Sequence, residues 1–134
     1  MQMASALSAG VTVHTSVVAQ SPKWSDLWRQ ADLFVLPTRD EAFGLAFQEA
    51  AAAGLPSIGT RLNAVPELVK DGVSGLLVPP GDRAALAAAL DHLLGDAQRR
   101  REWGSHGRAA IVRTAHPDVY RGRLTSAIRR AARR

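Results

Sequence analysis

Apolar residues recur along this chain in two patterns, one typical of strands and one typical of helices. Two uninterrupted apolar runs, Leu33–Leu36 and Gly75–Pro79, are typical of strands buried on both faces of a parallel sheet. A third, shorter strand is predicted at Pro56–Gly59. Apolar residues at helical spacing occupy Trp24–Ala31 and Arg83–Leu94. Strands that alternate with helices predict an α/β fold with a three-layer parallel sheet.

Boundary residues mark the other elements. A strand is predicted at Val11–Val17, where β-branched residues alternate with smaller or polar ones. An alanine-rich helix is expected to begin near Phe43-Gly44 and to end at Gly54, a helix-terminating glycine. Asp82 is the predicted N-cap of the helix over residues 83–94. The remaining predicted helices span 64–70, 96–103, 106–114 and 119–132, with Pro117 as the last break.

The composition is that of a globular protein. A length of 134 residues with 46% hydrophobic content suffices for one domain with a packed core. The absence of cysteine excludes disulfides and thiolate metal sites, and the four histidines are dispersed, so no metal site is predicted. No signal-peptide pattern and no apolar run near the ~18 residues that span a bilayer are found. The chain is therefore expected to be soluble and cytoplasmic.

Positive charge is concentrated at the C-terminal end. Residues 1–95 carry six Lys/Arg and nine Asp/Glu, a net charge of −3, whereas residues 96–134 carry eleven Arg and three acids, a net charge of +8. A solvated arginine-rich helix is the simplest interpretation; peripheral contact with an anionic membrane or an acidic partner stays open. Aromatic residues that could stack on bases are nearly absent there, which makes nucleic-acid binding the least favoured alternative.

Two glutamates flank the start of the alanine-rich helix. Glu41 precedes the helix, where the helix dipole stabilises negative charge. Glu49 lies inside it among alanines, and a buried carboxylate there needs hydrogen-bond donors such as sugar hydroxyls. Gly44 at the helix start lets a phosphate approach the backbone. From the residues alone, a capping Glu41 and a partly exposed Glu49 are the slightly favoured interpretation. The common dinucleotide, P-loop, hydrolase and zinc-protease motifs are absent.

Several motifs together resemble a known family. The segment EAFGLAFQE at 41–49 is followed by AAAAGLPSIGT, then by VPE at 65–67 and DGVSGLLVPPGD at 71–82. Their order and spacing resemble the C-terminal, nucleotide-sugar-binding half of retaining glycosyltransferases of the GT-B fold, glycosyltransferase family 4 type. The resemblance implies a partial, Rossmann-like C-terminal domain over residues 11–115, after a frayed start at 1–10 and before a basic helix at 116–134.

The resemblance also implies a function and a set of roles. The full protein would transfer a sugar from a nucleoside diphosphate sugar to an acceptor, with no cofactor and no metal. Glu41, the first glutamate of the E-x7-E motif, would be the catalytic-site residue that binds the donor sugar's hydroxyls. Backbone amides of Phe43, Gly44 and Leu45 would meet the diphosphate and sugar. Glu49, the second glutamate, would bind the ribose hydroxyls.

Three departures from the family pattern accompany these expectations. Asn63-Ala64 stands where the family often has Gly-Gly. The Arg and Lys that neutralise the diphosphate in the family have no counterpart, since Lys23 and Arg39 lie in other contexts. The N-terminal Rossmann-like domain, the expected partner in the family, is not in this sequence. A catalytically incomplete remnant that serves as a binding or assembly module is therefore the alternative function.

Two strands of the family's sheet are also expected to be missing between Val11–Val17 and Leu33–Leu36. A sheet without them has unpaired edges, which invite pairing with another chain. The sequence therefore predicts self-association through sheet edges, giving a homo-oligomer.

Overall fold

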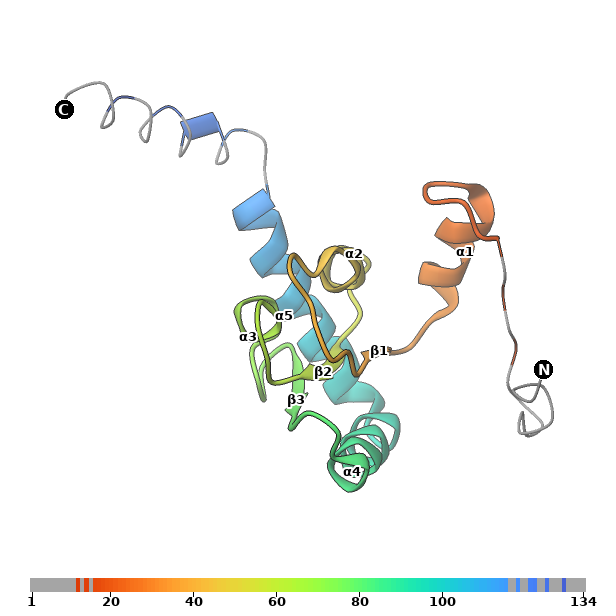
Figure 1. Ribbon diagram of the computed structural model, residues 1–134. Helices are drawn as coiled ribbons and strands as arrows, with labels where there is room; N and C mark the ends of the chain where they lie inside the picture. The colour runs from red at the N-terminus through yellow and green to blue at the C-terminus, as the bar shows by residue number, and fades with distance from the viewer. Residues whose placement is uncertain are drawn as a thin grey trace. The chain divides into compact units, whose positions relative to one another are not determined.

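The computed structural model describes residues 12, 14, 16–115, 118, 121, 122, 125 and 129 (Figure 1). The chain divides into two compact units, residues 1–30 and residues 31–134. The first contains helix α1 (Pro22–Gln30). The second contains, in order, β1 (Phe34–Leu36), α2 (Leu45–Ala52), β2 (Ser57–Thr60), α3 (Val65–Leu68), β3 (Gly75–Val78), α4 (Arg83–Leu94) and α5 (Ala97–Ala115).

The three strands form one parallel sheet in the order β1-β2-β3. Phe34 pairs with Ser57, and Ser57 pairs with Gly75. All four residues of β2 are buried, as expected for the central strand. The prediction that the first apolar run is buried on both faces is wrong, because β1 is half-buried and has only β2 as a neighbour within the described residues. The α/β class and the three strands are confirmed.

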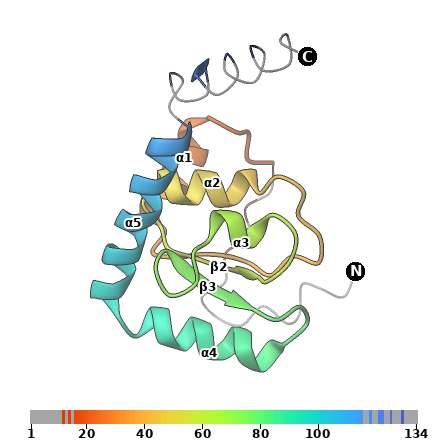
Figure 2. The same ribbon diagram turned by 90° about the vertical axis from the view of Figure 1, so that its left-hand side faces the viewer.

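Helices cover both faces of the sheet, which confirms the three-layer architecture (Figure 2). On one face, a core forms between the sheet, α4 and the first part of α5, and its buried members are Ile58, Val78, Ala89, Leu93 and Trp103. On the other face, α2 and α3 bury Phe47, Val65, Val69 and Leu77. The carboxyl ends of β1, β2 and β3 therefore lie between two packed layers of helices.

Helix α5 is one continuous element of 19 residues, whereas the sequence predicts two helices separated after Trp103. The two glycines near that point, Gly104 and Gly107, are buried inside α5 and permit close packing. A Cβ at Gly104 would lie 1.9 Å from the carbonyl oxygen of Gly54, and one at Gly107 would lie 3.7 Å from the Ala51 Cβ. These two glycines let α5 pack closely against α2 and the turn that follows it, and they do not end the helix.

Two predictions fall at the ends of the chain. Of the predicted strand Val11–Val17, residues 12, 14, 16 and 17 are described and none is in a strand. Ser16 has a φ of 56°, which is left-handed backbone, and no described strand pairs with this segment. Alternation alone does not make a strand without a hydrogen-bonded neighbour. The predicted start at 1–10 and most of the basic helix at 116–134 lie outside the described residues; the five described positions beyond 116 are helical.

Asp82 caps α4 as predicted, and Asp96 caps α5 in the same way. Asp82 Oδ1 accepts a hydrogen bond from the Ala85 N–H at 2.9 Å, and Asp96 Oδ1 accepts one from the Arg99 N–H at 2.8 Å. The bond from Arg99 holds the pKa of the Asp96 carboxyl below its ordinary value of 3.8. The stabilisation that this cap provides is present above that ordinary value and is lost as the pH falls through the lowered, folded-state pKa.

Replacing Asp82 by alanine is expected to lower the free energy of unfolding by about 1 kcal/mol, because the Ala85 N–H loses its cap. Urea denaturation followed by circular dichroism at 222 nm measures this loss. Asp91, an exposed residue of the same helix, is the matched control, and its replacement by alanine is expected to change stability by less than about 0.5 kcal/mol. Equal effects of the two substitutions would contradict the capping role.

Candidate functional site

The loop between β1 and α2, residues 37–44, is held at the carboxyl end of the sheet by hydrogen bonds from its own and neighbouring segments. Thr60, the last residue of β2, donates its hydroxyl to the Thr38 carbonyl at 2.5 Å. The Thr38 hydroxyl in turn accepts from the Asp40 N–H at 3.1 Å. Ligands of open α/β sheets bind outside the carboxyl ends of the strands, so this loop has the position of a binding loop.

The Glu41 carboxylate lies at the start of α2. Its Oε1 accepts hydrogen bonds from the Gly44 N–H at 2.7 Å and from the Phe43 N–H at 3.4 Å. Among the described residues, the second carboxylate oxygen, Oε2, accepts no hydrogen bond. Negative charge at this end of a helix is stabilised by the helix dipole. Glu41 therefore fulfils the capping interpretation of the sequence, through one of its two oxygens.

Gly44 makes the turn that brings Glu41 back over the helix start. Its φ of 61° is in the left-handed region, and a Cβ there would lie 2.2 Å from Leu68 Cδ1. Only glycine meets both conditions without strain. The side chains on either side, Phe43 and Leu45, are 77% and 68% exposed. Gly44 is thus buried between two large apolar side chains that lie in solvent.

Glu49 lies within α2, on a helix that buries Phe47 and Ala50 against the sheet. It is half-exposed, and its carboxylate has no hydrogen bond or ion pair to another described residue. The side chain is therefore available to a ligand. The structure places Glu41, Phe43, Gly44 and Leu45 together at the start of α2, with Glu49 one turn further along.

The loop after β2 braces the Glu41 loop through Asn63 and Ala64, the pair that stands where the family often has Gly-Gly. The Asn63 side-chain amide donates to Asp40 Oδ1 at 2.6 Å, and the Ala64 N–H donates to the Glu41 carbonyl at 3.4 Å. Asn63 has a φ of 48°, a conformation that glycine adopts freely and asparagine tolerates better than most residues. Asn63 therefore adopts a backbone conformation open to glycine, and its side chain adds one hydrogen bond that glycine could not make.

A pocket of about 280 Å³ opens at the carboxyl ends of all three strands, beside the same loop. Arg39 and Arg83 line it together with Thr38, Thr60 and the capping Asp82. Neither guanidinium has a hydrogen bond or ion pair to another described residue. The five predicted site residues do not line this pocket. Arg83 could not be singled out from the sequence, because its proximity to residues 37–39 arises only from the sheet.

In the part of the chain that the structure describes, no group of three or more His, Asp or Glu side chains could hold a metal ion. Among the helices of the same residues, none is long and apolar enough to cross a membrane.

Comparison with known proteins supplies the family. Residues 1–96 match the family described as glycosyl transferases group 1. The chain belongs to this family. It spans only 12% to 26% of the length of the curated relatives that it matches.

Two relatives and two solved structures illustrate the match. An exopolysaccharide phosphotransferase of Streptomyces coelicolor is 37% identical over 81% of this chain and 12% of its own length. A D-inositol 3-phosphate glycosyltransferase of an Arthrobacter species is 36% identical over 88% of this chain and 26% of its own. The C-terminal domain of a group 1 glycosyl transferase, LpcC from Francisella tularensis, has a TM-score of 0.64 at 31% identity, covering 75% of this chain and 51% of that one. HepE of Anabaena, solved with UDP and glucose, has a TM-score of 0.62 at 28% identity, with 65% and 24% covered.

These matches agree with the sequence resemblance. The chain has the α/β architecture of the C-terminal domain of its GT-B structural neighbours and corresponds to part of that domain. The parallel sheet with helices on both faces is that part of the fold.

Proposed function

We propose that this chain carries the donor-binding segment of a retaining glycosyltransferase and binds a nucleoside diphosphate sugar at the start of α2. The observation that carries the proposal is the pair of glutamates around Gly44, one folded over the helix start and one without a partner among the described residues. The structure of HepE with UDP and glucose supports the ligand class, since HepE shares this fold.

Glu41 has a divided role in this proposal. Oε1 holds the Phe43 and Gly44 N–H groups and so keeps the turn closed. Oε2 then accepts a hydroxyl of the donor sugar, as a carboxylate oxygen has more than one acceptor site. The capping interpretation and the ligand interpretation are thus compatible.

In this proposal the backbone amides of Phe43, Gly44 and Leu45 bind the diphosphate, but two of them are already engaged by Glu41. The N–H groups of Phe43 and Gly44 point to Glu41 Oε1, so a phosphate oxygen reaches them only when that carboxylate shifts. The Leu45 N–H is in the first turn of α2, where backbone donors have no partner within the helix. Leu45 is therefore the amide that meets an anion first.

Glu49 binds the ribose of the nucleotide in this proposal. Hydroxyl groups donate to an ionised carboxylate, and Glu49 has none of its acceptor sites used by a described residue. The whole protein would transfer the sugar with retention of configuration, using the N-terminal Rossmann-like domain that the family resemblance implies. Neither a cofactor nor a metal has a role in this mechanism.

Isothermal titration calorimetry with UDP-glucose and GDP-mannose tests the proposal on the 134-residue chain. Replacing Glu49 by glutamine is expected to weaken binding of the preferred donor about tenfold or more, because a hydrogen bond to a charged group is worth about 1.5–3 kcal/mol. Glu102→Gln, an exposed change on α5, is the matched control and leaves the affinity unchanged.

The two possible failures have different meanings. Equal affinities of the wild type and Glu49→Gln would contradict the role of Glu49. No binding of any nucleotide sugar by the wild type would favour the alternative, a catalytically incomplete remnant that acts as a binding or assembly module.

A further inference from the structure

Among the described residues, strand β3 pairs with another strand, β2, on one side only, and on its other side a single parallel β-bridge joins Gly75 to Asp71. Toward β2, the Ser74 and Val78 carbonyls accept hydrogen bonds from the Ser57 N–H at 3.3 Å and the Arg61 N–H at 2.8 Å. Polar groups of successive residues in a strand point to opposite sides, so Gly75 and Leu77 direct theirs away from β2. The outer edge of the sheet is therefore made by these two residues.

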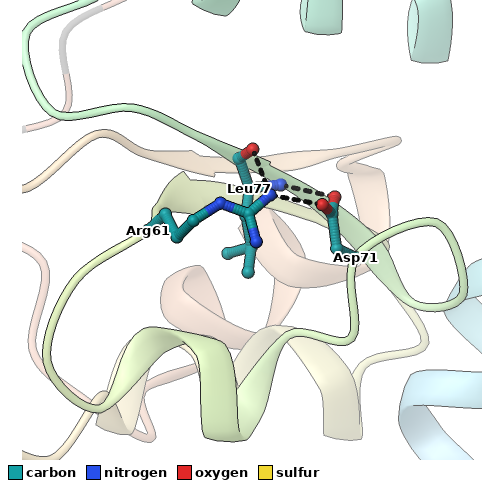
Figure 3. Close-up of polar contacts among 3 residues, drawn as sticks. All are labelled: Arg61, Asp71 and Leu77. Carbon is teal, nitrogen blue, oxygen red and sulfur yellow. Dashed lines mark hydrogen bonds and ion pairs between the residues drawn. The ribbon is translucent and has the colours of Figure 1, made fainter.

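Most of these outward groups already have partners (Figure 3). The Leu77 N–H donates to Asp71 Oδ1 at 3.0 Å, and the Leu77 carbonyl accepts from Arg61 Nη2 at 3.4 Å. The Gly75 carbonyl accepts from the Gly72 N–H at 2.9 Å. An incoming strand would need the same groups for its own ladder.

Arg61 and Asp71 are joined to each other across this edge. Arg61 Nη2 lies 2.5 Å from Asp71 Oδ2, and the two side chains are 54% and 39% exposed. An exposed ion pair adds little to stability. Its position matters more, because the Asp71 carboxylate engages the outward N–H of Leu77 and the Arg61 guanidinium engages the Leu77 carbonyl.

Two further features bear on this edge. Pro79 and Pro80 follow β3 directly, and neither has an N–H to extend a ladder. Beside the strand runs an open hollow of about 490 Å³, lined by Leu77, Pro79 and apolar residues of α4. The side chains of an added strand would enter this hollow.

We propose that Asp71 and Arg61 form an edge cover that prevents β3 from pairing with a strand of a second copy of this chain. The strand that would pair is β1, which has one neighbour, β2, within the described residues. Pairing of β1 with β3 of the next copy is head-to-tail, so it would repeat from copy to copy and build rings or filaments of more than two chains. With β3 covered, the self-association expected from the sequence is left to the β1 edge. Pairing of β1 with β1 of a second copy uses both free edges and therefore stops at two chains.

Multi-angle light scattering over a range of concentrations tests the proposal with Asp71→Ala. The wild type is expected to have a mass of no more than two chains at every concentration, whereas Asp71→Ala forms assemblies that grow with concentration. Asp91→Ala, which removes an exposed carboxylate of α4, is the matched control and behaves as the wild type. Asp71→Asn keeps an oxygen acceptor for the Leu77 N–H and is expected to grow less than Asp71→Ala.

Amide hydrogen exchange at low concentration gives a readout that does not depend on assembly. In Asp71→Ala, the Leu77 amide is expected to exchange at least tenfold faster, while the Ser57 amide, bonded to Ser74, keeps its protection. Arg61→Ala, which uncovers the Leu77 carbonyl, tests the mass if Asp71→Ala does not fold. An unchanged mass of the folded variant would overturn the proposal whether or not Leu77 exchange changes, as would wild-type assemblies larger than two chains.

Discussion

Gly104→Ala is expected to lower the free energy of unfolding by about 3 kcal/mol or more, because the added Cβ would lie 1.9 Å from the Gly54 carbonyl oxygen. The obstacle is backbone, so no side chain can rotate away. Gly54 itself has a φ of 77°, and this turn between α2 and β2 cannot shift without moving the helix that carries Glu49. Urea denaturation followed by circular dichroism at 222 nm measures the loss.

Gly107→Ala is the matched control in the same helix. The nearest atom to its added Cβ is 3.6 Å away, an ordinary contact. Removing a glycine from a helix interior is expected to raise stability by about 0.5–1 kcal/mol. Opposite signs for two glycine-to-alanine changes three residues apart would establish the close approach of α5 at Gly104. A stabilised Gly104→Ala variant would contradict it.

Phe47→Ala is expected to cost about 3–5 kcal/mol, the range for removal of a buried aromatic side chain. Phe47 is 2% exposed, and its ring meets Phe34 of β1 edge to face with centroids 5.3 Å apart. The ring also lies over Gly59 of β2, where an added Cβ would come within 2.9 Å of it. Phe47 thus joins α2 to two strands, and its loss is measured by the same urea titration.

Phe43→Ala provides the comparison for Phe47→Ala. The two residues are four positions apart and chemically identical, but Phe43 is 77% exposed. Its truncation is expected to change stability by less than about 0.5 kcal/mol. Similar losses for the two variants would show that the packing of α2 on the sheet is misassigned.

These expectations bear on the proposed donor site because α2 carries it. Glu41 and Gly44 are placed by the helix start, and Glu49 is placed by the helix itself. Phe47 and Gly104 contribute no group to a ligand, yet they hold α2 against β1, β2 and α5. Both substitutions are therefore expected to weaken donor binding at temperatures where α2 loosens, without changing the chemistry of the site.

Much of the fold could be predicted from the sequence because its signals are local. The helix over residues 83–94 has the predicted bounds, since its cap, its alanine-rich interior and its final glycine lie within fourteen consecutive residues. The strands near residues 34, 57 and 75 were found from short apolar runs between turn residues. The candidate site residues were identified from a motif nine residues long.

The tertiary structure decided everything that depends on residues far apart in the chain. Val11–Val17 has the alternation of a strand but no described neighbour, and strand formation requires one. The sequence predicts that a helix ends at residue 103, whereas α5 continues through Gly104, which packs closely against Gly54, fifty positions away. Such contacts cannot be inferred from local periodicity, because no pattern within one element specifies which backbone comes near it.

The same division holds for the stretch that carries the candidate chemistry. The sequence by itself determined a strand, a charged loop and a glycine-initiated helix with Glu41 and Glu49 at its start and within it. Only the tertiary structure decided that Asn63 braces the loop that contains Glu41. It also decided that Arg61 and Asp71 cover the outer edge of β3. The physical reason is that helices and turns follow from neighbouring residues, whereas sheet edges and long-range hydrogen bonds arise only when separate segments pack together.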